Sequence, residues 1–359
     1  MHWLALLAGC LALILARVLR APLKSYRLTG FAWFFAALLI MGFAIRIGAE
    51  SQKITRPTEY DSFVVHAADL VQEDPDAPLV VFLGASFTRN ALDDEELTRR
   101  LRAKGYPHRV INLSLQGASL QERDQSLWDF MRLTQRAPDV AFLEVADEFD
   151  RDPAYVFNVA KFSDRAIKQV TPNAAYWSVK GLSQGQCDGM ASCVKAWAFL
   201  GIHAVMNWSN IGLLATGESI PDIEAVPAFD PQDTPRDTFT LSVDEIRAAL
   251  EVPAEVTPSN GPSWARLFRM DQRARLIQAG VRRVAYYYPP VISPDEREYV
   301  ADLCAGELSA FPCIAPVDRT LLAQLERPVW FDDKHLLRDG ADVYTDWLAG
   351  QIDQWGALK

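Results

Sequence analysis

Histidine is scarce in this sequence, with five residues among 359. Imidazole is the side chain best suited to act as a general base near neutral pH, so such a base has few possible positions here. His2 precedes an apolar segment, and three others, His66, His108 and His203, have no acidic neighbour in a strand-end context. His335 therefore remains as the candidate for a catalytic histidine.

Cysteine is equally scarce, and its spacing argues against metal. The five cysteines include no Cys-x-x-Cys pair and have no nearby histidine, so we expect disulfides rather than the alternative, a zinc site, and no cofactor. Four cysteines allow three pairings, and we expect the local ones because each closes a short loop in an oxidising compartment. The expected pairs are Cys187 with Cys193 and Cys304 with Cys313.

Positive charge is in deficit, with a formal net charge of −10. Residues 51–359 alone carry 31 basic and 45 acidic side chains, a net of −14. An acidic domain of this kind is not expected to bind nucleic acid or anionic lipid headgroups, which favours a neutral or weakly charged partner. Solubility explains the charge equally well.

Long apolar runs occur at the amino-terminal end, at Trp3–Leu19 and Leu28–Gly48. The second has the roughly 20 residues that a membrane-spanning helix needs, so residues 1–50 are expected to form an anchor with two transmembrane helices. The cations between the runs would hold their link in the cytoplasm and place the rest outside; they are Arg17, Arg20, Lys24 and Arg27. A cleaved signal peptide is the alternative, disfavoured because no basic region precedes the first run. Residues 51–78 read as a polar connector.

The apolar run Leu79–Leu83 predicts a strand buried on both faces, and the small residues Gly84, Ala85 and Ser86 end it in a tight turn. A serine is thereby presented at the carboxyl end of a central strand, where open α/β sheets form their crevice. A serine hydroxyl needs a base, and the base needs an orienting carboxylate. Asp332 precedes His335 by three residues, a spacing that brings the two side chains together on a turn.

Strands and helices alternate through the rest of the chain, which predicts a parallel sheet in an α/β domain over residues 79–359. The predicted strands cover residues 79–83, 109–113, 140–145, 281–288 and 313–317. The predicted helices cover residues 60–72, 93–104, 121–136, 264–279, 294–305 and 340–355. A large insertion at about 151–262 interrupts this rhythm and is expected to be a lid or a docking surface.

Three segments together carry a family resemblance. Gly84-Ala85-Ser86, the segment Asn112–Gly117 and the segment Asp332–His335 resemble three of the four blocks of the SGNH (GDSL-type) hydrolase superfamily in order and spacing. The resemblance implies a flavodoxin-like five-stranded parallel sheet with Ser86, His335 and Asp332 as a catalytic triad.

The sequence departs from the family pattern at two places. Ala85 stands where the family has aspartate, and the third block reads Glu144-Val-Ala-Asp147, so Ala146 replaces the expected oxyanion asparagine. The oxyanion hole would then consist of the backbone N–H groups of Ser86 and Gly117, since glycine lets the backbone approach a ligand closely. Asn90 and Asn112 are further candidates.

With its predicted anchor, the chain is similar to the membrane-anchored SGNH branch that includes alginate O-acetylation proteins and the D-alanine transfer protein of teichoic-acid modification. That likeness implies an extracytoplasmic (periplasmic) serine acyltransferase at the cytoplasmic membrane. It would form an acyl-Ser86 intermediate and O-acetylate a cell-surface polysaccharide beside a membrane-bound O-acyltransferase. The alternatives are a carbohydrate or lipid esterase of the same fold and a non-catalytic membrane-tethered polysaccharide-assembly protein.

Overall fold

The computed structural model of the chain describes residues 27–51, 57–145, 223–258 and 264–356, with single positions at 173, 176, 177, 180 and 358. The chain divides into two compact units. One comprises Met1–Glu59 and Ala160–Ile223, and the other comprises Tyr60–Val159 and Glu224–Lys359. The second unit holds the sheet and all the residues predicted for the triad.

The sheet of the second unit is parallel throughout, with strand order β2-β1-β3-β4-β5. The strands are β1 (Leu79–Leu83), β2 (Arg109–Asn112), β3 (Val140–Glu144), β4 (Arg283–Tyr287) and β5 (Cys313–Ile314). The predicted α/β fold with a five-stranded parallel sheet is therefore confirmed, and the order is that of flavodoxin-like sheets. The chain leaves β1 for β2 on one side and enters β3 on the other, so the carboxyl ends of β1 and β3 are the position at which open α/β sheets bind their ligands.

The helices of this unit connect the strands, and most lie where the sequence predicts them. They are α3 (Glu59–Glu73), α4 (Ser86–Ala91), α5 (Asp94–Ala103), α6 (Leu120–Thr134), α10 (Val243–Glu251), α11 (Trp264–Gln278), α12 (Pro294–Ala305), α13 (Arg319–Gln324) and α14 (Arg338–Trp355). Three of them, α4, α10 and α13, were not expected; α4 and α13 have six residues each, too few for a clear helical period.

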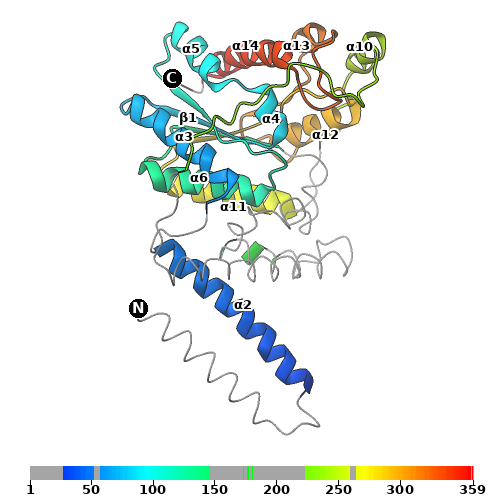
Figure 1. The fold of residues 1–359 in the computed structure, drawn as a ribbon. Helices are drawn as coiled ribbons and strands as arrows, with labels where there is room; N and C mark the ends of the chain where they lie inside the picture. The colour runs from blue at the N-terminus through cyan, green and yellow to red at the C-terminus, as the bar shows by residue number, and fades with distance from the viewer. Residues whose placement is uncertain are drawn as a thin grey trace. The chain divides into compact units, whose positions relative to one another are not determined.

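Helices cover both faces of the sheet (Figure 1). On one face, Val80, Phe82 and Tyr287 pack with side chains of α5, α10, α13 and α14. On the other face, Val81 and Leu83 pack with side chains of α3, α6 and α11. Because successive side chains of a strand point to opposite faces, this explains why β1 is apolar at every position. The strand that precedes Ser86 is thus held rigidly inside the domain.

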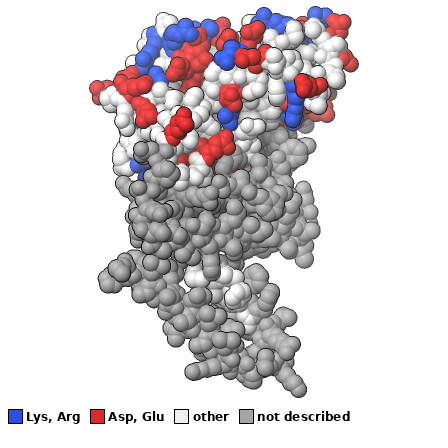
Figure 2. Space-filling model, viewed as in Figure 1, with Lys and Arg blue, Asp and Glu red and all other residues white. Residues whose placement is uncertain are grey.

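Opposite charges are interspersed on the surface of this unit, as Figure 2 shows for one face. Helix α5 illustrates the arrangement: Arg100 pairs with Glu96 and Asp346, Arg102 pairs with Asp74, and Lys104 lies 3.5 Å from Asp353. Pairing of this kind prevents the cations of α5 from forming a continuous positive surface.

The sequence predicts two transmembrane helices near the amino terminus. The first, residues 3–19, lies outside the described residues, and the second coincides with helix α2 (Arg27–Ser51) in the other unit. None of the helices in the described part of the chain combines the length and the apolarity that crossing a membrane requires. The structure therefore does not support the expected pair.

One of the two expected disulfides is confirmed. Cys304, at the end of α12, is bonded to Cys313 in β5, with the two Cα atoms 5.5 Å apart. The bond ties a helix to the edge strand of the sheet. Cys187 and Cys193 lie outside the described residues, as does most of the predicted insertion.

Candidate active site

Ser86 is the first residue of α4, three positions after the end of β1. Ala85 precedes it in an extended conformation as the residue that caps the helix. The first N–H groups of a helix have no acceptor within that helix, so the backbone N–H of Ser86 is available for a bond outside it. The turn thereby places a hydroxyl and a backbone donor of one residue, itself half-buried, at the carboxyl edge of the sheet.

Asp332 and His335 lie on a tight loop that precedes α14. One carboxylate oxygen, Asp332 Oδ1, accepts hydrogen bonds from the backbone N–H of Lys334 at 3.0 Å and of His335 at 2.9 Å. The loop closes where the N–H of Phe331 donates to the carbonyl oxygen of His335 at 2.8 Å. Sequence spacing predicted such a turn, and these bonds form it.

The three residues proposed for the triad meet in space. Asp332 Oδ1 lies 2.7 Å from His335 Nδ1, and His335 Nε2 lies 2.9 Å from Ser86 Oγ. Since a carboxylate can only accept, Nδ1 carries the proton, and the unprotonated Nε2 is the atom that faces the serine. This tautomer is the one that can take the hydroxyl proton.

The electrostatics favour an ionised Asp332. Burial by itself would raise the pKa of this carboxyl, but the hydrogen bonds from the His335 ring and from the backbone N–H of Lys334 outweigh it and lower the pKa below its usual value. Arg236 lies 3.7 Å from the second oxygen, Oδ2. Asp332 can therefore hold the imidazole in position as an anion.

Asp333, the neighbour of Asp332, has a different environment. Its side chain is exposed, and its carbonyl oxygen accepts the N–H of Ile292 at 3.0 Å. The expectation that the imidazole is paired with Asp332 rather than with its neighbour matches this geometry.

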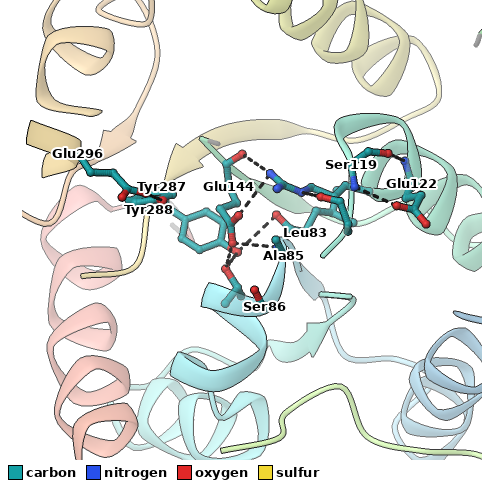
Figure 3. A network of polar contacts seen from close by, with 12 residues as sticks. Leu83, Ala85, Ser86, Ser119, Glu122, Glu144, Tyr287, Tyr288 and Glu296 are labelled. Carbon is teal, nitrogen blue, oxygen red and sulfur yellow. Dashed lines mark hydrogen bonds and ion pairs between the residues drawn. The ribbon is translucent and has the colours of Figure 1, made fainter. Parts of the chain in front are cut away.

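Aromatic side chains flank the imidazole. The ring of Phe87, the residue after Ser86, lies 5.0 Å from the His335 ring, measured between ring centroids. The Phe331 ring lies 6.3 Å from the His335 ring in an edge-to-face arrangement. Beyond Phe87, the Tyr288 ring lies at 5.7 Å, and its hydroxyl donates to Glu296 (Figure 3). These rings limit the orientations open to the imidazole.

The loop that carries Gly117 runs beside the serine turn. The N–H of Leu113 donates to the carbonyl oxygen of Phe82 at 2.9 Å, and the N–H of Leu115 donates to the carbonyl oxygen of Gly84 at 3.1 Å. Gly117 has a φ of 59°, in the left-handed region that favours glycine. The loop ends at Ser119, which begins α6 with reciprocal bonds to Glu122 (Figure 3).

The two asparagines proposed as further oxyanion donors are engaged in structural bonds. Asn90 Nδ2 donates to the carbonyl oxygen of Asp230 at 2.5 Å. Asn112 is buried; its Nδ2 donates to Leu92, and its Oδ1 accepts the N–H of Ser114, both at 3.0 Å. The backbone N–H groups of Ser86 and Gly117 therefore remain the better candidates. Ala146 and Asp147 lie outside the described residues.

Sequence reasoning missed Glu144, a buried carboxylate at the end of β3 that contacts the serine turn (Figure 3). The available signal was an acid at the end of an otherwise apolar strand. The last part of the insertion, which was expected to be a lid or a docking surface, borders the site: Asp230 N–H donates to the carbonyl oxygen of Arg89 at 3.0 Å, and Arg236 N–H donates to that of Phe331 at 2.9 Å.

Two surface cavities lie away from the triad. One, of about 480 Å³, is lined largely by α5, and the other, of about 590 Å³, lies between β5 and α14. Neither is lined by Ser86, Asp332 or His335, so the contacts of these residues define the candidate site. Within the described residues, no group of three or more His, Cys, Asp or Glu side chains is arranged to hold a metal ion.

Comparison with protein-family models finds no match to this chain, and comparison with curated proteins finds none either. The geometry of the site and the motif resemblance therefore support the function proposed below.

Proposed function

We propose that this protein is a serine acyltransferase that works through an acyl-Ser86 intermediate. The observation that carries the proposal is the continuous set of contacts from Asp332 to His335 at 2.7 Å and from His335 to Ser86 at 2.9 Å. A serine activated in this way attacks acyl groups, and the half-buried Ser86 follows β1 at the carboxyl edge of the sheet, where open α/β sheets bind their ligands.

The reaction has two halves, with His335 moving one proton in each. Ser86 Oγ attacks the acyl carbon while its proton passes to His335 Nε2, and the backbone N–H groups of Ser86 and Gly117 stabilise the oxyanion. The bond to the leaving group then breaks, and Nε2 returns the proton to that group. An acceptor hydroxyl next gives its proton to Nε2 and attacks the acyl-enzyme; the bond between the acyl carbon and Ser86 Oγ breaks, and Nε2 returns the proton to Oγ.

The acceptor and the setting follow from the motif resemblance. We propose a polysaccharide hydroxyl as acceptor, an acetyl group as the transferred acyl group, and an extracytoplasmic location beside a membrane-bound O-acyltransferase. The Cys304–Cys313 disulfide supports an oxidising compartment. The acidic composition of residues 51–359 suits a neutral or weakly charged partner.

Intact mass measurement tests the first half of the reaction. The protein is exposed to an activated acetyl ester, and we expect one acetyl adduct on Ser86 in the wild type and none in Ser86→Ala. Circular dichroism of both proteins controls for folding. Absence of the adduct in the wild type, with its membrane fraction present, would overturn the acyl-enzyme and favour a binding protein on the same fold.

Partition of the acyl group tests the second half. With neutral oligosaccharides added, we expect Ser86-dependent acetylated sugar, because an acceptor held in place competes well with water. Release of acetate alone, across a range of acceptors, would make the protein an esterase.

A further inference from the structure

Residues on both sides of the serine, Ala85 before it and Thr88 after it, are bonded to a single atom of Glu144. Its Oε2 accepts the backbone N–H of Ala85 at 3.0 Å and the hydroxyl of Thr88 at 2.5 Å. Ala85 directly precedes Ser86, and Thr88 follows two residues later in the same helical turn. The serine is therefore held from both sides by one buried carboxylate oxygen (Figure 3).

The donor and the acceptor of each hydrogen bond in this network can be assigned. Thr88 has one hydroxyl proton and gives it to Glu144, since a carboxylate only accepts. The contact of 2.7 Å between Thr88 Oγ1 and the Tyr287 hydroxyl then has Tyr287 as donor, and the longer contact of 3.4 Å from the same hydroxyl to the Leu83 carbonyl oxygen shares that proton. Burial raises the pKa of Tyr287 well above its ordinary value, so this donor keeps its proton. The chain of bonds runs from Tyr287 through Thr88 to Glu144.

The closeness of this packing explains why Gly84, two residues before the serine, is a glycine. A Cβ added at Gly84 would lie 2.4 Å from Glu144 Oε2 and 2.4 Å from Thr88 Oγ1. No side chain fits at these distances, so the position must be glycine for the carboxylate to reach the turn. The small residues of the serine motif are thus matched to Glu144.

Arg123 extends the same network to the loop that carries Gly117. Its Nη1 lies 3.3 Å from Glu144 Oε1, and its Nε donates to the carbonyl oxygen of Ala118 at 3.2 Å. Ala118 is the residue after Gly117. The Glu144–Arg123 pair therefore connects the serine turn to the loop that is expected to supply the second oxyanion donor.

We infer that Glu144 is a positioning residue: with Arg123, it holds Ser86 within reach of His335 and fixes the spacing between the N–H groups of Ser86 and Gly117. This inference rests on the proposed function. Glu144 acts through Ala85, Thr88 and Arg123, and it lies on the side of the turn occupied by the core. Its negative charge is balanced by the guanidinium, which limits its repulsion of a developing oxyanion.

Glu144→Gln tests the role because it keeps the shape and removes the charge. In glutamine, an NH2 group replaces one of the two carboxylate oxygens. That group can only donate, so it cannot accept from Arg123 or from the N–H of Ala85, and at least one of these bonds is lost. The turn then relaxes. We expect kcat with an activated acetyl ester to fall on the order of 100-fold, since small displacements of reacting groups cost that much. KM should change little, because Glu144 does not touch the substrate.

Two further substitutions separate positioning from stability. Glu307 forms a comparable buried pair with Arg269 at 3.1 Å in the same unit, and it takes no part in the proposed site. Glu307→Gln should lower the melting temperature as Glu144→Gln does and leave kcat near the wild-type value. Thr88→Val should reduce kcat, and Thr88→Ser, which restores the hydroxyl, should recover it.

The outcomes distinguish failure of the positioning role from failure of the proposed function. If the wild type shows Ser86-dependent turnover and Glu144→Gln retains the kcat of Glu307→Gln, Glu144 is a structural residue and the inference is wrong. Equal activity of Thr88→Val and Thr88→Ser would also overturn it. If the wild type itself lacks Ser86-dependent turnover, the proposed function fails, and the positioning role fails with it.

Discussion

At the scale of single residues, the orientation of His335 depends on one oxygen atom. Asp332 Oδ1 accepts two backbone N–H groups of its own loop as well as the imidazole Nδ1–H. The backbone bonds fix the carboxylate, and the carboxylate fixes the ring, so that Nε2 is presented to Ser86. Removing the negative charge should disturb the tautomer more than it disturbs the loop.

Asp332→Asn is expected to lower Ser86-dependent turnover by roughly 10⁴-fold, as loss of the negative charge in such triads does by favouring the wrong tautomer. Asp333→Asn is the matched control, since Asp333 is exposed and the ring is bonded to Asp332 Oδ1. Its kcat should stay close to that of the wild type. Steady-state kinetics on one acyl ester compare the two variants, and the opposite ranking would show that the orienting residue is Asp333.

At the scale of elements, a buried acid joins α5 to β2. Asp94 is the first residue of α5, and its Oδ2 accepts the backbone N–H of Asn112, the last residue of β2, at 3.0 Å. Its neighbour Asp93 caps the helix by accepting the N–H of Glu96 at 2.8 Å. Burial raises the pKa of Asp94 from 3.8 to about 7. The two adjacent aspartates therefore differ in role.

The raised pKa of Asp94 predicts a pH dependence of stability. Between its unfolded value of 3.8 and about 7, the folded protein holds a proton that the unfolded chain has lost. This contribution to the free energy of unfolding is complete below the window and is lost as pH rises through it. Urea unfolding at several pH values should show that decline, and Asp94→Asn should flatten it.

Asp342→Asn, at an exposed position of α14, is the control for the general effect of removing a carboxyl. It should keep the decline of the wild type. An Asp94→Asn variant with the same slope as Asp342→Asn would mean that Asp94 is ionised in the folded protein at neutral pH.

At the scale of the whole α/β unit, the edge of the sheet at β5 is short and depends on a covalent bond. β5 has two residues, and Cys313 within it is bonded to Cys304 of α12. Cys304 packs against the cluster of Tyr288, Val291 and Val300, which Phe87 also contacts. The disulfide thus lies in the same cluster as the residue that follows the proposed nucleophile.

The double variant Cys304→Ser with Cys313→Ser should lower the free energy of unfolding by about 2–3 kcal/mol, the chain-entropy value for closing so short a loop. Cys304 and Cys313 are separated by nine residues in the sequence. Thermal unfolding with and without reductant measures the effect, and reductant should destabilise the wild type by a similar amount. Equal stability of wild type and double variant without reductant would show that the bond is not formed in the protein.

The sequence by itself determined the strands of the sheet, most of its helices and the turn that pairs Asp332 with His335. These features depend on local signals: the apolar run Leu79–Leu83, the small residues that follow it, and the three-residue spacing from Asp332 to His335. Each can be read within a few residues, because strand burial and turn formation follow from neighbouring side chains. The disulfide between Cys304 and Cys313 belongs to the same class, since it closes a short loop. The apolar runs near the amino terminus predicted two spans; the first lies outside the described residues, and no helix of the described part has the length and apolarity to cross a membrane.

Only the tertiary structure decided what supports the serine. Glu144 and Ala85 are 59 residues apart, and Tyr287 and Thr88 are 199 apart, so no local pattern connects them. The parallel register brings the carboxyl ends of β1, β3 and β4 to one edge, and burial leaves each polar group there in need of a partner. The same requirement assigned Asn112 to the backbone of Leu92 and Ser114 rather than to the site. A buried carboxylate must find donors wherever the fold places them, and here the fold places the serine turn beside it.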